Sequence, residues 1–206
     1  QDAFDSRRIS DRLEEKLCRR AFTADDKAFI ESAIYFFLAT ADAEGRPDCS
    51  FKGGPAGFVR ITGPSELAFP DYDGNGMFVS MGNIGATAKI GLLFIDFETP
   101  NRLRLHATAT VLRDDPAMER FPGAELIVRG RVDNTFVNCA RYIHPHQRVR
   151  ASDYVPDDRG DQPFPAWKRI DLIQPFLPED QQGRAAESGG EIDVEEYARR
   201  LADGTS

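Results

Sequence analysis

The chain has 206 residues, of which 34 are acidic and 26 are Lys or Arg, and its formal net charge is -8. This length suits one domain with a full core and an added terminal element, and it excludes two ordinary domains. The acidic excess gains nothing from counterion release, so nucleic acid is not expected as a partner. The first residues carry no apolar leader and no apolar run approaches a membrane span, which predicts a cytoplasmic protein without a membrane partner.

The three cysteines, Cys18, Cys49 and Cys139, are far apart and form no C-x-x-C pair. An odd, scattered set fits neither a disulfide framework nor a four-thiolate zinc site, which favours a reduced intracellular protein. Metal-capable donors recur at Cys139, His144 and His146. No fourth ligand follows them and a proline separates the two histidines, so we predict no metal site.

Residues 1–34 are predicted to be helical. Leu13 and Leu17 stand four residues apart in a charged stretch, and Thr23 with Asp26 forms a capping box before an apolar run. The period then changes to short β-branched and aromatic runs separated by turn signals. The predicted strands are 35–41, 47–53, 58–61, 66–69, 90–97, 102–112 and 125–132. This pattern predicts a mainly β, α+β protein with an antiparallel sandwich or small barrel.

The faces of two predicted strands suggest a binding site. In strand 47–53, Asp48, Ser50 and Lys52 alternate with apolar residues and therefore share one face. In strand 102–112, Arg104 lies on the polar side, where a solvated surface and the wall of a binding site are both consistent with the pattern.

A polar loop between predicted strand 66–69 and a short apolar helix contains Asn75 between Gly74 and Gly76. We expect Pro70 to end the strand and both glycines to adopt backbone angles closed to other residues. Free backbone N–H groups at the start of the helix suit an anion such as phosphate. An ordinary turn rich in Asp and Gly is the alternative.

Past residue 171 the pattern weakens. Residues 175–190 are rich in Pro, Gln, Gly and Ser and are interpreted as a linker. Asp193 and Glu196 then predict a capped last helix with Val194, Tyr197 and Leu201 turned inward. The predicted organisation is a helical segment over 1–34, a barrel domain over 35–174, and a linker with a short helix over 175–206.

Three stretches in succession resemble a known family: FLATADAEGRPDCSFKGGPAGFVRI, ELAFPDYDGNGMFVSMGNI, and IGLLFIDF followed by RLRLHATATVL. They are similar to the flavin-binding split-barrel proteins related to pyridoxamine 5′-phosphate oxidase, over about residues 36–139. This resemblance implies an antiparallel split β-barrel that binds FMN as a homodimer. It places the flavin in a groove between two barrels, where both subunits contact it.

The resemblance also implies which residues bind the cofactor. Residues 50–52 match the strand that lines the flavin and reaches its phosphate, and residues 69–71 match a strand end beside the ring. The loop and helical turn after them surround the ribityl phosphate in the family, and Arg104 matches a strand position near the cofactor or the dimer contact. Trp167 either covers a flavin edge or anchors the C-terminal segment. The implied set is Ser50, Phe51, Lys52, Phe69, Pro70, Asp71, Asn75, Ser80, Asn83, Arg104 and Trp167.

The implied activity is that of an FMN-dependent oxidoreductase acting on a small molecule at the dimer interface. No catalytic side chain can be assigned, because a flavin carries the redox chemistry in its own ring. The C-terminal segment lacks the Glu-Phe-Trp signature of the biosynthetic oxidase, which argues against synthesis of pyridoxal phosphate. Two alternatives stay open: a non-catalytic flavin-binding or sensory protein, and a split barrel that uses deazaflavin or haem.

Overall fold

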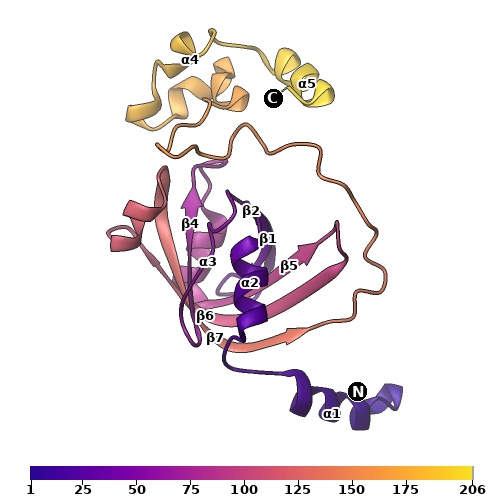
Figure 1. Ribbon diagram of the computed structural model, residues 1–206. Helices are drawn as coiled ribbons and strands as arrows, with labels where there is room; N and C mark the ends of the chain where they lie inside the picture. The colour runs from indigo at the N-terminus through magenta and orange to yellow at the C-terminus, as the bar shows by residue number, and fades with distance from the viewer. Residues whose placement is uncertain (206) are drawn as a thin grey trace. The chain divides into compact units, whose positions relative to one another are not determined.

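The computed structural model describes residues 1–205, which form two compact units (Figure 1). The first comprises residues 1–151 and 155–160, and the second comprises the described part of 152–154 and 161–206. The first unit contains η1 (Asp2–Phe4), α1 (Arg7–Leu17), α2 (Ala24–Ser32), β1 (Tyr35–Ala41), β2 (Pro47–Gly53), β3 (Arg60–Gly63), β4 (Glu66–Tyr72), α3 (Val79–Thr87), β5 (Lys89–Asp96), β6 (Asn101–Leu112), η2 (Pro116–Arg120) and β7 (Ala124–Val137). The second contains η3 (Ala166–Arg169), η4 (Asp171–Phe176), η5 (Glu179–Gln181), α4 (Arg184–Glu187) and α5 (Val194–Asp203).

The seven strands form one antiparallel sheet in the order β2-β1-β5-β6-β7-β4-β3. Four strands separate β2 from β4 in this order, yet Lys52 of β2 and Asp71 of β4 contact each other through their side chains. The sheet therefore curls until its two ends approach, and side chains close the gap where backbone pairing is absent. This architecture confirms the predicted antiparallel split β-barrel with flanking helices.

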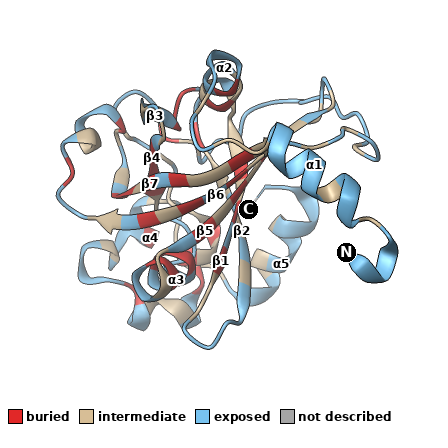
Figure 2. Cartoon of the chain, turned by 90° about the horizontal axis from the view of Figure 1, so that it is seen from below, coloured by how far each residue is buried: buried red, intermediate tan, exposed pale blue. Residues whose placement is uncertain are grey.

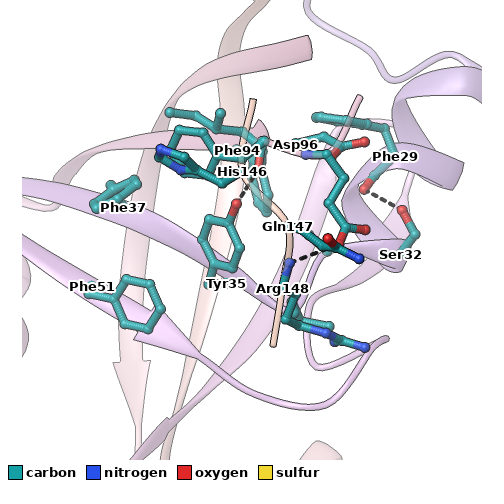
Figure 3. A pocket seen from close by; sticks show the side chains of 15 residues that line it. Phe29, Ser32, Tyr35, Phe37, Phe51, Phe94, Asp96, His146, Gln147 and Arg148 are labelled. Carbon is teal, nitrogen blue, oxygen red and sulfur yellow. Dashed lines mark hydrogen bonds between the residues drawn. The ribbon is translucent and has the colours of Figure 1, made fainter. Parts of the chain in front are cut away.

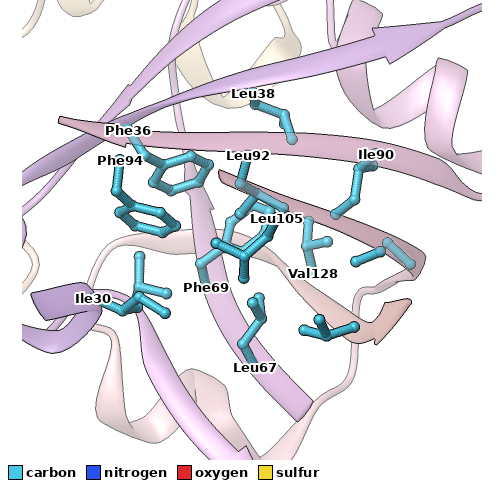
Figure 4. Close-up of a cluster of buried hydrophobic side chains, with 14 of the residues drawn as sticks. Ile30, Phe36, Leu38, Leu67, Phe69, Ile90, Leu92, Phe94, Leu105 and Val128 are labelled. Carbon is cyan, nitrogen blue, oxygen red and sulfur yellow. The ribbon is translucent and has the colours of Figure 1, made fainter. Parts of the chain in front are cut away.

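Alternation along the strands fills the barrel interior with apolar side chains. Phe36, Leu38, Phe69, Phe94 and Leu105 are fully buried and come from four different strands (Figure 4). The ring of Phe36 lies 5.0 Å from that of Phe69 and 5.2 Å from that of Phe94, measured between centroids. Such aromatic pairs add to the free energy of burial, so this cluster holds the curled sheet together.

Two predicted strands, 66–69 and 125–132, end at least three residues too early, and pairing explains both. Strand β4 runs through Pro70 to Tyr72, although Pro70 was expected to end it. Strand β3 pairs with β4 only at residues 66–68, so one side of β4 is an edge at Pro70, where a missing N–H is tolerated. Strand β7 extends to Val137 because the long strand β6 pairs with it past a bulge at His106/Ala107.

Helices α2 and α5 begin where the sequence predicts. Thr23 and Asp26 form the capping box of α2, and the Asp193 carboxylate accepts the backbone N–H of Glu196 at the start of α5. The apolar residues of α5 are not turned inward, because Val194 and Leu201 are 51% and 54% exposed. Burial concentrates on the strands and on α3, whereas α1 has no buried residue (Figure 2). Among residues 1–205, no helix combines the length and apolar character that crossing a membrane requires.

Candidate functional site

A cluster of polar side chains lies where β2, the end of β4 and α3 meet inside the curled sheet. The register of β1 with β2 places Phe36 opposite Lys52, Leu38 opposite Ser50 and Thr40 opposite Asp48. Because paired residues share a face, the polar face of β2 points to the same side as the buried face of β1. We call this cluster the polar corner; it consists of Asp48, Ser50, Lys52, Asp71, Ser80 and Asn83.

An ion pair between Lys52 and Asp71 forms one side of the polar corner. The Lys52 Nζ atom donates to Asp71 Oδ1 over 2.6 Å, and the side chains are 21% and 5% exposed. Asp71 therefore compensates the positive charge of Lys52. An anionic ligand at Lys52 would compete with this carboxylate.

Hydroxyl and amide groups form the other side and attach α3 to the sheet. The Ser50 and Ser80 Oγ atoms are 3.0 Å apart, and Ser80 Oγ donates to Asp48 Oδ2 over 3.1 Å. The Asn83 side chain donates from Nδ2 to Thr40 Oγ1 over 3.0 Å, and Asn83 is buried. Buried polar groups of this kind stabilise a fold only when they are paired, and these pairs fix the orientation of α3.

The loop before α3 leaves the start of that helix without a side-chain cap. The N-cap residue, Phe78, has the left-handed φ of 49° and makes no capping hydrogen bond. Asn75 is exposed, and its Oδ1 accepts the Met77 N–H over 3.0 Å. Gly76 has a left-handed φ of +70°, which few other residues adopt, whereas Gly74 does not adopt a positive φ.

The structure brings together five of the residues proposed from the sequence: Ser50, Lys52, Asp71, Ser80 and Asn83. Phe69 and Pro70 are buried on β4 next to them in sequence. Sequence reasoning placed Asp48 on this face without assigning it to the site, and it missed Thr40, which becomes visible only through strand register.

Three of the proposed residues lie away from these contacts. Phe51 occupies the opposite face of β2 and is 62% exposed. Arg104 is on β6, with its guanidinium 5.6 Å from the centre of the Phe136 ring. Trp167 belongs to the second unit, where the Lys168 ammonium lies 5.4 Å from the ring centre. Their roles in cofactor binding stay predictions.

The donor set of the polar corner indicates what kind of group it holds. One ammonium, two carboxylates, two hydroxyls and one amide give a net charge of about -1 together with both donors and acceptors. A ligand segment that both donates and accepts hydrogen bonds fits this set better than an isolated anion does. Among residues 1–205, no three His, Cys, Asp or Glu side chains are grouped so that they could hold a metal ion.

The curled antiparallel sheet, closed by side chains, is that of a split-barrel protein. Residues 22–137, more than half of the chain, match the family model described as pyridoxamine 5′-phosphate oxidase. The chain therefore belongs to the pyridoxamine 5′-phosphate oxidase family, as the sequence resemblance indicated.

Three solved structures match parts of this chain at low sequence identity. HupZ of Group A Streptococcus is 21% identical, with 56% of this chain and 93% of HupZ covered and a TM-score of 0.46. An FMN-binding protein of Syntrophomonas wolfei is 11% identical, with 67% and 96% covered and a TM-score of 0.44. The haem storage protein HutZ of Vibrio cholerae is 19% identical, with 55% and 92% covered and a TM-score of 0.42. No curated protein gave a significant sequence match.

Proposed function

We propose that this protein is an FMN-dependent oxidoreductase that acts on a small molecule bound against the flavin at a homodimer interface. The observation that carries the proposal is the polar corner, which stands in a chain of the pyridoxamine 5′-phosphate oxidase family at positions that the family resemblance assigns to the flavin. Membership of the family supports a cofactor of the flavin class, and the corner supports its position.

The residues of the polar corner fit the uncharged parts of a flavin. Ribityl hydroxyls donate to carboxylates such as Asp48 and accept from hydroxyls such as Ser50, which matches the mixed donor set. Lys52 lies on the strand that the family resemblance assigns to the flavin and its phosphate, so its ammonium group would donate to an oxygen of the cofactor. The start of α3, which has no side-chain cap, would offer backbone N–H groups to the phosphate.

When bound, FMN supplies two-electron redox chemistry through its own ring. The protein therefore needs to hold and orient the cofactor and to shield it from water. Asn83 and Ser80 hold α3 against the sheet, and Asp71 fixes Lys52 before any ligand arrives. Preformed positions of this kind reduce the entropic cost of ligand binding.

Two features of the surface beside the polar corner support a homodimer. Strand β2 is at the edge of the sheet, so one side of its backbone has no neighbouring strand within the unit. Met77, Phe78 and Val79 at the start of α3 are 69%, 40% and 43% exposed. An edge strand beside exposed apolar side chains is the kind of surface that a second copy covers.

Reconstitution of the full chain with excess FMN, followed by desalting, tests the proposal. We expect a yellow protein with a flavin absorption spectrum, bound FMN confirmed by mass spectrometry and the mass of a dimer in sedimentation. A colourless protein would overturn it. If the protein purified from its native host carried deazaflavin or haem, that cofactor would take the place of FMN in the proposal. A bound flavin that no donor or acceptor ever turns over would favour a sensory protein.

A further inference from the structure

A cavity of about 550 Å³ opens on the face of β1 and β2 that is opposite to the polar corner (Figure 3). Its walls come from the end of α2, the start of β1, the middle of β2, the end of β5 and residues 146–148. All of these segments belong to the first unit. We call it the aromatic pocket, after the rings that line it: Phe29, Tyr35, Phe37, Phe51, Phe97 and His146.

Ring contacts hold the aromatic pocket in shape. Tyr35 stands between Phe51 and Phe97, nearly parallel to both, with centroid distances of 5.5 and 6.2 Å. Phe37 meets Phe51 edge-on at 5.9 Å, and the His146 ring lies 4.9 Å from Phe97. The Tyr35 hydroxyl donates to the Ile95 carbonyl over 2.8 Å, which fixes the central ring. These rings offer flat faces to a ligand.

The charges around the aromatic pocket are predominantly negative. Asp96 and Glu98 line it, with Arg148 as the cation among the lining residues. The Asp96 carboxylate accepts the backbone N–H groups of Glu98 and Thr99, and Glu98 accepts the backbone N–H of Arg148, so both carboxylates are held in place. Partial burial raises the pKa of Tyr35, and the negative charges of Asp96 and Glu98 raise it further as the smaller causes.

We propose that the aromatic pocket is a second binding site, which accepts a flat aromatic ligand that carries one positive charge. Ring faces attract cations through their negative electrostatic potential, and the two fixed carboxylates add to that attraction. The volume lies within the range of about 300–1,000 Å³ found for small-molecule sites. An anionic ligand is disfavoured by Asp96 and Glu98.

This site is independent of the proposed flavin site. The residues of the polar corner point to the other side of β2, because Ser50 and Lys52 alternate with Phe51 along the strand. The occupant of the aromatic pocket therefore contacts none of the residues of the polar corner, although Phe51, which lines the pocket, is also among the residues that the family resemblance assigns to the flavin. Failure of one proposal leaves the other unaffected.

Three bicyclic probes of nearly equal size and different charge test this site: 1-methylquinolinium, 1-methylnaphthalene and naphthalene-1-carboxylate. Affinity for the full chain is measured by equilibrium dialysis at pH 8, with and without FMN. We expect the cation to bind about tenfold more tightly than the neutral probe and the anion to bind most weakly. FMN should leave this order unchanged.

Two variants locate the bound probe. Phe51→Ala removes an exposed ring and should weaken the cation and the neutral probe alike. Glu98→Gln keeps an acceptor for Arg148, and it should weaken the cation by about threefold to tenfold while leaving the neutral probe unaffected. Phe176→Ala and Glu44→Gln, at exposed positions outside the aromatic pocket, are the matched controls.

The proposal stands only if the cation binds most tightly and both pocket variants act as described while the controls do not. Equal affinity for all three probes would overturn it. So would the absence of binding, including the case in which sedimentation shows that a second copy has closed the cavity.

Discussion

The polar corner and the aromatic pocket occupy opposite faces of the same two strands. Ser50 and Lys52 enter hydrogen bonds and an ion pair on the inner face of β2, whereas Phe51 stacks on Tyr35 on the outer face. Both surfaces follow from a side-chain period of two. The inner face holds charges that are already paired, and the outer face holds rings that a ligand can still reach. If both proposals hold, one pair of strands serves two ligands of different chemistry.

The largest expected effect is on the free energy of unfolding, which should fall far more for a substitution on the inner face than for one on the outer face. Phe36→Ala on the inner face of β1 removes a fully buried ring that contacts the rings of Phe58, Phe69 and Phe94. We expect it to lower the free energy of unfolding by about 3–5 kcal/mol in urea denaturation. Phe51→Ala on the outer face should cost less than about 1 kcal/mol, because Phe51 is 62% exposed. Equal losses would contradict the division into faces.

A smaller effect tests the charge in the polar corner. Lys52→Ala should weaken FMN binding by about 1.5–3 kcal/mol in fluorescence titration, because a charge-assisted hydrogen bond is lost. Lys89→Ala, on the exposed side of β5, is the control and should leave the affinity unchanged.

Loss of Lys52 also leaves the buried carboxylate of Asp71 unpaired, which can itself destabilise the fold. The double variant Lys52→Met with Asp71→Asn removes both charges and should recover stability while FMN binding stays weak. Unchanged flavin affinity in both variants would remove Lys52 from the cofactor site.

The smallest expected effect concerns the ion pair between Asp115 and Arg129, which contributes to stability and lies outside the polar corner. Asp115 accepts from Ala117 N at the start of η2 and from Arg129 on β7, and its side chain is 2% exposed. The Arg129 hydrogen bonds lower the pKa of Asp115 below its ordinary value. We expect Asp115→Asn to cost about 1–2 kcal/mol at pH 7, since Arg129 is partly exposed and screened.

The sign of the pH dependence follows from the lowered pKa. The stabilisation by Asp115 is fully present above about pH 4, the ordinary value in an unfolded chain, and is lost as the pH falls through the lower folded value. The difference between the native protein and Asp115→Asn should therefore shrink below about pH 4 in thermal unfolding. Asp11→Asn, at an exposed position of α1, is the control and should change stability little at any pH. A difference that grows on acidification would contradict this assignment.

The sequence by itself determined the class of fold and most of its strands. The strands at Tyr35–Ala41 and Pro47–Gly53 were predicted to the residue, because alternation and turn residues are local signals. The same alternation placed Asp48, Ser50 and Lys52 on one face. The family resemblance then predicted which of these positions face a cofactor.

Only the tertiary structure decided what those side chains contact. That Asp71 compensates Lys52, and that Asn83 reaches Thr40, depends on how far the sheet curls, which no local pattern encodes. The aromatic pocket likewise joins Phe29, Phe51 and His146, which are far apart in the chain. Strand register and sheet closure bring such residues together, because they are set by packing of the whole core and not by neighbours in sequence.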